Sequence, residues 1–267
     1  MCEHIRAARD VQSATNLYLD LMKWCLTDWI YGNEDPGPDP QDPSFDAMIR
    51  FKGAPGGKWP SHAHTMIGMA RLDNIQSCLE SILADGVAGD LIETGVWRGG
   101  ATIFMRAVLK AYGVTDRTVW VADSFRGLPE PDPERYPVDA GDRLHTFAKL
   151  AVPVEVVREN FRKYGLLDDQ MRFVEGWFRD TLPQVPIERL ALIRLDGDMY
   201  ESTWVALESL YPKLADGGYL IVDDYGAVEG CPQAVNDFRK LHHISEAMQP
   251  IDWTGVYWRR EQVPHRS

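Results

Sequence analysis

Short apolar runs alternate with amphipathic helical patterns through the last two thirds of the chain. Turn residues bound the apolar runs, which is typical of buried strands in a parallel sheet. The runs cover residues 90–94, 118–122, 171–175, 190–195, 219–222 and 255–260. Between them, helical spacing of apolar residues predicts helices over residues 101–112, 154–164, 204–211 and 232–241. Strands that alternate with helices predict an α/β fold with a doubly wound, mostly parallel sheet.

Two more helices are predicted ahead of this sheet. Residues 14–31 and 62–82 both place apolar side chains at helical spacing. Residues 32–60, between them, are rich in Pro, Gly and Asp, a composition typical of either a passive surface loop or a lid. The sequence therefore predicts an N-terminal helical and lid extension over residues 1–88 and a main domain over residues 89–267.

Acidic residues follow two of the predicted strands. Asp196 and Asp198 follow the fourth apolar run, and Asp223 and Asp224 follow the fifth. Ligands of open α/β sheets lie beyond the carboxyl ends of the strands. Two carboxylates about 4 Å apart repel by about 4 kcal/mol at an effective dielectric constant near 20, so a cluster must protonate, spread into solvent or hold a cation. An oxygen-only ligand set favours Mg²⁺ over Zn²⁺, and the alternative is that these acids are turn formers or helix caps.

A glycine-rich turn follows the first predicted strand. In Gly95-Val96-Trp97-Arg98-Gly99-Gly100, glycines would let backbone amides approach a ligand at a helix N-terminus, although the spacing is not G-x-G-x-x-G. Glu93, just before the turn, suits the methionine part of S-adenosylmethionine better than a pyrophosphate. Asp123, at the end of the second strand, is placed either to accept both ribose hydroxyls of a nucleoside or to cap the next segment. Together these residues predict a nucleoside cofactor site.

A second proline-rich stretch covers residues 126–150. Such a long loop in a compact domain is uncommon unless it covers a site. His145 within it could orient a substrate hydroxyl or face solvent. After the third strand, Gly176-Trp177-Phe178 supplies two aromatic rings that could either bracket a planar base or pack in the core.

Composition restricts the class of partner. The 267 residues include 40 acidic and 28 basic side chains, and the net charge of −12 argues against nucleic acid or an anionic membrane as the main partner. The four cysteines show no C-x-x-C spacing, so neither a zinc knuckle nor a redox dithiol is indicated, and a reducing compartment is favoured. We find neither a signal-peptide core nor an apolar run long enough to span a bilayer, so we expect a cytoplasmic protein that binds small molecules.

The combined motifs resemble the class I S-adenosylmethionine-dependent methyltransferases and, more narrowly, the macrocin/mycinamicin O-methyltransferase family. That family also contains the noviose 4-O-methyltransferase of novobiocin biosynthesis. The resemblance is carried by Glu93-Thr94-Gly95-Val96-Trp97-Arg98-Gly99-Gly100, Asp123-Ser124-Phe125, Tyr164-Gly165-Leu166-Leu167-Asp168-Asp169-Gln170, Leu195-Asp196-Gly197-Asp198 and Asp223-Asp224-Tyr225. It implies a seven-stranded sheet and a homo-oligomeric, magnesium-dependent enzyme that methylates a deoxysugar hydroxyl of a glycosylated natural product in antibiotic biosynthesis.

The resemblance also implies roles for single residues. Asp196, Asp223 and Asp224 would be magnesium ligands, and Asp198 would be the general base. The implied cofactor-binding residues are Thr65, Met66, Glu93, Thr94, Gly95, Arg98, Gly99, Gly100, Asp123, Ser124, Gly176, Trp177 and Asp196.

The chemistry of methyl transfer agrees with these roles. A sugar hydroxyl is a poor nucleophile because its pKa lies far above neutrality, and a bound cation lowers the pKa of an oxygen that it coordinates. Three other functions stay open: a metal-dependent methyltransferase of a phenol or catechol, a nicotinamide oxidoreductase and a non-catalytic nucleoside-binding protein. The absent G-x-G-x-x-G spacing argues against the oxidoreductase.

Overall fold

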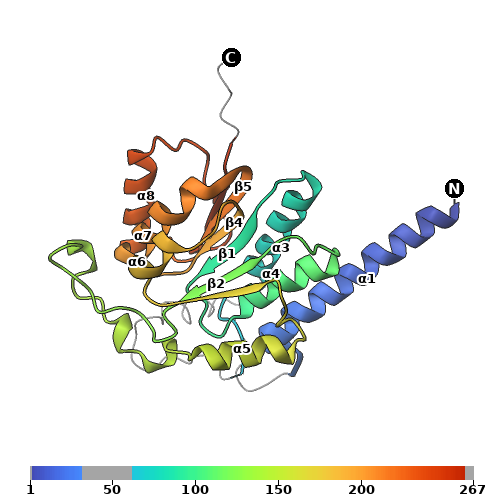
Figure 1. Ribbon diagram of the computed structural model, residues 1–267, viewed down its shortest axis with the longest axis horizontal. Helices are drawn as coiled ribbons and strands as arrows, with labels where there is room; N and C mark the ends of the chain where they lie inside the picture. Colours follow the sequence, from blue (N-terminus) through green and yellow to red (C-terminus); the bar gives the residue numbers. More distant parts are fainter. Residues whose placement is uncertain (1, 32–61, 262–267) are drawn as a thin grey trace, which may run out of the picture.

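The computed structural model describes residues 2–31 and 62–261 of the chain (Figure 1). The loop or lid predicted at residues 32–60 lies outside the described residues. The strands are β1 (Asp90–Thr94), β2 (Val119–Asp123), β3 (Met171–Glu175), β4 (Leu190–Leu195), β5 (Leu214–Val222), β6 (Gln249–Pro250) and β7 (Val256–Arg259). The α-helices are α1 (Cys2–Leu26), α3 (Met69–Ala84), α4 (Gly100–Ala111), α5 (Val154–Lys163), α6 (Phe178–Thr181), α7 (Tyr200–Leu210) and α8 (Gly230–Leu241).

The seven strands form one sheet in the order β3-β2-β1-β4-β5-β7-β6. β1 to β5 pair in parallel, and β7 pairs antiparallel with both β5 and β6. The predicted doubly wound, mostly parallel sheet is therefore confirmed. Between β1 and β4 the strand order changes direction, and in open α/β sheets ligands bind at such a switch point.

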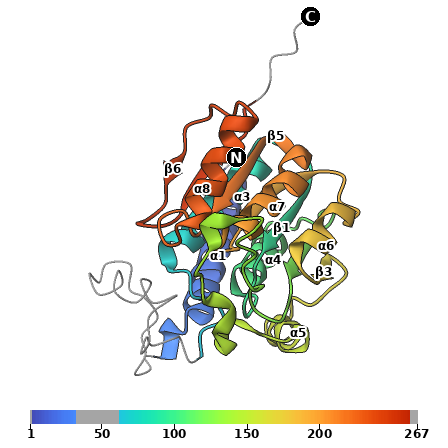
Figure 2. The same cartoon turned by 90° about the vertical axis from the view of Figure 1, so that its left-hand side faces the viewer.

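Helices cover both faces of the sheet. Figure 1 shows α6, α7 and α8 on one side and α3 and α4 on the other, and Figure 2 turns the first group toward the viewer. Each face has its own apolar core, one with buried residues of α1, α3, α4 and α5 and the other with buried residues of α7 and α8. The layers leave the carboxyl ends of the central strands available for a site.

The N-terminal helices differ in detail from the prediction. The predicted helix at residues 62–82 begins only at Met69, because the preceding backbone is used in contacts with other elements. The amides of His64 and Thr65 donate to the carbonyl of Leu26, and the carbonyl of His64 accepts from Gly100 N. These bonds place the segment before α3 against the glycine-rich turn.

The boundary predicted at residue 88 crosses a continuous core. Leu19 of α1 and Ile75 of α3 belong to the same buried cluster as Leu91 of β1. The N-terminal helices therefore help to build the core that supports the sheet, and a division at this residue stays a prediction. Among the described residues, no helix combines the length and apolar character that a membrane span needs, and Cys25, Cys78 and Cys231 are free thiols.

Candidate active site

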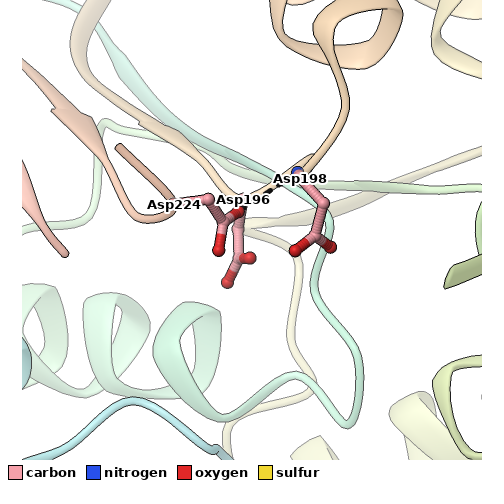
Figure 3. A group of neighbouring side chains, drawn as sticks. All are labelled: Asp196, Asp198 and Asp224. Carbon is pink, nitrogen blue, oxygen red and sulfur yellow. Dashed lines mark hydrogen bonds between the residues drawn. The ribbon is translucent and has the colours of Figure 1, made fainter. Parts of the chain in front are cut away.

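Three of the four predicted acids lie together at the ends of β4 and β5. Asp196 and Asp198 follow β4, Asp224 follows β5, and one carboxylate oxygen from each lies within 4.8 Å of the others. Figure 3 shows the three carboxyl groups pointing to the same side of the chain. The amide of Asp198 also donates to Asp224 Oδ2 at 3.1 Å. We call Asp196, Asp198 and Asp224 the acid trio.

Asp223 lies elsewhere, although it precedes Asp224 directly. Successive residues at the end of an extended strand point to opposite sides. The carboxylate of Asp223 forms ion pairs with Arg194 through Oδ1 and with Arg71 through Oδ2. The structure therefore does not bring Asp223 into the acid trio, as its predicted role as a ligand would require.

Arg194 is the centre of a buried ion network. It is fully buried in β4, where its guanidinium pairs with Glu93 and Asp223 and donates to Asp196 Oδ2 at 3.0 Å. Burial opposes its charge, but the three neighbouring acids outweigh that effect and raise the pKa of Arg194 above its usual value. Arg71 extends the network by bonding Asp252 as well as Asp223.

Glu93 belongs to this network and does not line the pocket described next. Its side chain pairs with Arg194 and accepts a hydrogen bond from Thr102 Oγ1 at 2.7 Å. Burial raises the pKa of Glu93 to about 7, against the opposing effect of Arg194. The carboxylate of Glu93 therefore faces Arg194 of β4, and its contact with a cofactor stays a prediction.

A pocket opens beside the acid trio, with an empty volume of about 750 Å³ that is partly open to solvent. The predicted site residues in its wall are Met66, Gly95, Asp123, Ser124, Trp177, Asp196 and Asp198. The other predicted cofactor residues do not line it; these are Thr65, Glu93, Thr94, Arg98, Gly99, Gly100 and Gly176. The pocket thus joins the turn after β1, the end of β2 and the first two members of the acid trio.

Gly95 must be glycine because of how closely β1 and β4 approach. Its φ is +82°, and a Cβ built there would lie 1.7 Å from the carbonyl oxygen of Asp196. Non-glycine residues with positive φ also follow three strands, namely Trp97 after β1, Phe125 after β2 and Asp198 after β4. Such backbone conformations cluster at functional sites, where the surrounding structure enforces them.

Asp123 holds the floor of the pocket in place. One of its oxygens accepts from Val96 N and the other from Phe125 N, each at 2.7 Å. Burial raises the pKa of Asp123, while these backbone donors act in the opposite direction. Ser124 forms the adjoining turn by donating to the carbonyl of Gly127 at 2.6 Å. Asp123 therefore fixes the glycine-rich turn as well as lining the pocket.

Several predicted residues support the pocket wall from behind. Arg98 packs on the ring of Trp97 and donates to the carbonyl of Ala63 at 2.8 Å. A Cβ on Gly100 would lie 2.5 Å from the carbonyl oxygen of His64, so α4 can begin close to the segment before α3 only with glycine there. Gly176 donates to the carbonyl of Asp123 at 3.0 Å.

Sequence reasoning did not assign several wall residues. Phe178, which was predicted either to bracket a planar base or to pack in the core, also lines the pocket. The unassigned wall residues are Trp97, Gly127, Leu128, Pro129, Leu150, Arg179, Gly197, Glu201, Ser202 and Val205. Four of them come from residues 126–150, so the predicted cover of the site does contribute to its wall. His145 of that stretch does not line the pocket. Glu201 could have been found from its place in the first turn of the helix after Asp198.

Comparison with known proteins places these features in a family. The model of the family described as macrocin-O-methyltransferase (TylF) matches residues 15–260. The chain is 55% identical to an 8-demethyl-8-(2,3-dimethoxy-α-L-rhamnosyl)-tetracenomycin-C 4′-O-methyltransferase of Streptomyces olivaceus, over 96% of this chain and 97% of that one. It is 48% identical to a demethyldecarbamoylnovobiocin O-methyltransferase of Streptomyces niveus, over 97% of this chain and 99% of that one.

A solved structure agrees with the sequence comparisons. The O-methyltransferase NovP superposes with a TM-score of 0.82 at 49% identity, over 93% of this chain and 100% of that one. The fold of this chain is thus shared with a solved O-methyltransferase. The chain belongs to the macrocin-O-methyltransferase (TylF) family and is an O-methyltransferase.

Proposed function

We propose that the protein is an S-adenosylmethionine- and magnesium-dependent enzyme that methylates a deoxysugar hydroxyl of a glycosylated natural product during antibiotic biosynthesis. The observation that carries this proposal is the acid trio, two of whose members line the pocket at the switch point of the sheet. The sugar acceptor is supported by the names of the two Streptomyces relatives, which methylate rhamnosyl-tetracenomycin and demethyldecarbamoylnovobiocin.

The acid trio fits a hard divalent cation. All its donors are carboxylate oxygens, and Mg²⁺ typically binds through one or two carboxylates with water or substrate in the other positions. Asp196 and Asp224 would hold the ion. Asp223 is left out of this set because its two oxygens face Arg194 and Arg71. A bound cation would lower the pKa of a hydroxyl group at the site.

Asp198 would be the general base. It shares the trio with the two proposed ligands and also lines the pocket, so it can receive a proton from an acceptor hydroxyl. Its left-handed backbone, with a φ of +59°, and the bond from its amide to Asp224 hold it in that place. Proton transfer to a positioned base contributes roughly 10²- to 10⁴-fold to a rate.

The remaining wall would hold the nucleoside and align it with the acceptor. Gly95 lines the pocket, Asp123 lies at the position that commonly accepts ribose hydroxyls, and Trp177 offers an aromatic face for the adenine. S-adenosylmethionine supplies an electrophilic methyl group when bound. Alignment of that methyl with the acceptor oxygen can contribute roughly 7–11 kcal/mol to lowering the barrier.

Mass spectrometry of candidate acceptors tests the proposal. Demethylated rhamnosyl-tetracenomycin and demethyldecarbamoylnovobiocin would each be incubated with the protein, S-adenosylmethionine and Mg²⁺, beside a catechol. We expect a gain of one methyl on a glycoside, its loss in excess chelator and its recovery with added Mg²⁺. Methylation of the catechol alone would contradict the sugar acceptor, and full activity in chelator would contradict the metal.

We also propose that the protein forms a homo-oligomer. Leu17, Leu21 and Trp24 lie at helical spacing on α1 and are 68%, 44% and 44% exposed, respectively. Figure 1 shows α1 extending away from the sheet. Clustered apolar side chains of this kind commonly mark interaction surfaces. Light scattering after size-exclusion chromatography should give a dimer or larger species, and a monomer at micromolar concentration would contradict it.

A further inference from the structure

Glu201 is a buried acid in the wall of the pocket to which no role has yet been given. It lies in the first turn of α7, three residues after Asp198, and it is only 4% exposed. Asp196 and Asp198 line the same pocket. The side chain is therefore next to the space where ligands bind, and it is not part of the acid trio.

The two oxygens of the Glu201 carboxylate differ. Oε1 accepts a hydrogen bond from Arg179 Nη1 at 3.1 Å. Oε2 is buried and has no hydrogen-bond partner among the described residues. A buried polar atom without a partner destabilises a protein by about 1–3 kcal/mol, and more for a charged group, so such an atom in a side chain that lines a pocket needs an explanation.

The carboxylate of Asp139 holds the backbone of Glu201 in place. Asp139 accepts hydrogen bonds from Tyr200 N at 2.8 Å and from Glu201 N at 3.0 Å, and it is itself 4% exposed. The side chain of Arg179 is 44% exposed and reaches Glu201 from α6. With its main chain bound to Asp139 and one oxygen bound to Arg179, the carboxylate is fixed before a ligand arrives.

We propose that Glu201 is a ligand-recognition residue whose Oε2 accepts a hydrogen bond from an N–H or O–H group of a bound ligand. Two bound molecules could supply such a donor. One is the cofactor, through the exocyclic amine of its adenine, and the other is the acceptor, through a sugar hydroxyl. The second source rests on the proposed function, whereas the first needs only the nucleoside.

Glu201→Gln is the most informative substitution because it preserves shape. Arg179 can only donate, so the amide oxygen of the glutamine will face Arg179. The amide NH₂ then takes the position of Oε2. Because NH₂ can only donate, it cannot accept the hydrogen bond from the N–H or O–H group of the ligand. Glu208→Gln is the matched control, because Glu208 is an exposed residue of the same helix.

Calorimetry tests the cofactor as the source of the donor. S-adenosylhomocysteine is compared with S-inosylhomocysteine, in which a carbonyl replaces the amine. If the amine is the donor, the unmodified protein prefers S-adenosylhomocysteine by roughly tenfold or more, since hydrogen bonds to charged groups are among the stronger ones. Glu201→Gln then loses this preference, and Glu208→Gln keeps it.

Steady-state kinetics tests the acceptor as the source. If a sugar hydroxyl is the donor, Glu201→Gln raises the acceptor KM roughly tenfold or more and leaves the affinity for S-adenosylhomocysteine within twofold. The proposal is overturned if both quantities stay within twofold of the unmodified protein. It is equally overturned if Glu201→Gln weakens the binding of S-adenosylhomocysteine and S-inosylhomocysteine by the same factor and also lowers the melting temperature of the protein. That result would indicate a structural role for Glu201.

The two proposals fail separately. If the unmodified protein methylates no glycoside, the proposed acceptor class is wrong. In that case the calorimetric comparison alone tests the role of Glu201. If Glu201→Gln and the unmodified protein prefer S-adenosylhomocysteine over S-inosylhomocysteine to the same extent, the proposed role of Glu201 is overturned.

Discussion

Asp223 and Asp224 are adjacent in sequence and yet belong to regions with opposite properties. Asp223 lies in the buried network, where Arg194 and Arg71 pair with its two oxygens. Asp224 lies in the acid trio, within 4.8 Å of oxygens of two other carboxylates. In the first region, negative charge is balanced by arginines that belong to the fold. In the second, acids are brought together at the edge of a ligand pocket, which is the pattern expected of a site.

This difference separates residues that hold the strands from residues that act on a ligand. Arg194 links Glu93 of β1, Asp196 after β4 and Asp223 after β5. Removing one partner from a buried network leaves an uncompensated charge and is strongly destabilising. Asp196 belongs to both regions, so the cleaner test of the acid trio is Asp198 or Asp224, whose removal should instead affect catalysis. The predictions that follow test this separation, starting with the largest expected effect.

Asp198→Asn should lower kcat by roughly 10²- to 10⁴-fold, because the amide cannot accept the proton from the acceptor hydroxyl. The unfolding free energy should change little, since the side chain lies at the edge of the pocket. Steady-state kinetics and urea unfolding measure the two effects. Asp116→Asn, at an exposed position, is the control, and a kcat within tenfold of the unmodified enzyme would exclude Asp198 as the base.

Arg194→Met should lower the unfolding free energy by about 3–5 kcal/mol, because Glu93 and Asp223 lose the cation that they share. Denaturant unfolding followed by circular dichroism measures this change. Arg162→Met removes a surface ion pair of α5, whose contribution is about 0–1 kcal/mol. Equal stability losses in the two variants would show that the network does not stabilise the fold.

Exchanging each acid of the adjacent pair for its amide should separate stability from activity. Asp223→Asn weakens two charged hydrogen bonds, so we expect a loss of about 1.5–3 kcal/mol in unfolding free energy. Asp224→Asn keeps an oxygen that can accept the hydrogen bond from Asp198 N, so we expect it to lower stability less than Asp223→Asn and to raise the Mg²⁺ concentration needed for half-maximal activity. If instead Asp223→Asn raised the Mg²⁺ requirement and Asp224→Asn lowered the unfolding free energy, Asp223 would be the metal ligand.

His64 lies outside both acidic regions and gives the smallest expected effect. Burial, together with nearby Lys163 and Arg98, lowers the pKa of His64 from 6.5 to about 4. Between these values the unfolded chain binds more protons, so stability is fully present above about pH 6.5 and falls as the pH decreases toward 4. Because the ring is partly exposed, we expect a loss of less than about 1 kcal/mol between pH 7 and 5.

Thermal unfolding at several pH values measures this loss, and His64→Gln should reduce the slope. His62→Gln, at an exposed position, should not. An unchanged slope in His64→Gln would show that other groups set the acid sensitivity of the protein.

Periodicity and turn residues predicted much of the sheet. The bounds of β1, β3 and β4 agree with the predicted runs, because each strand is followed directly by a glycine or an acid. The prediction for β5 included only its last residues, since Gly217 and Gly218 interrupt the apolar pattern while the strand continues through them. The family was also recognised correctly from short motifs.

Side-chain partners across long sequence distances could not be predicted. Arg71 and Asp223 are 152 residues apart, so nothing local indicates that one neutralises the other. Arg194 lies within an apolar run, where a single charge does not reveal its partners. The position of Glu93 before the glycine-rich turn predicted a contact with a cofactor, and nothing local indicated that its carboxylate pairs with Arg194 of β4. The sequence therefore indicates which acids follow the strand ends, but it does not indicate which arginine each acid pairs with.

The close approach of Gly95 to the carbonyl of Asp196 limits how acceptor preference can change. Because no side chain fits between them, the base of the pocket cannot be widened or shifted by substitution at that point. The part of the wall contributed by Leu128, Pro129 and Leu150 contains no glycine of this kind. Attempts to redirect the enzyme to new glycosides should therefore vary Leu128, Pro129 and Leu150 and leave Gly95 unchanged.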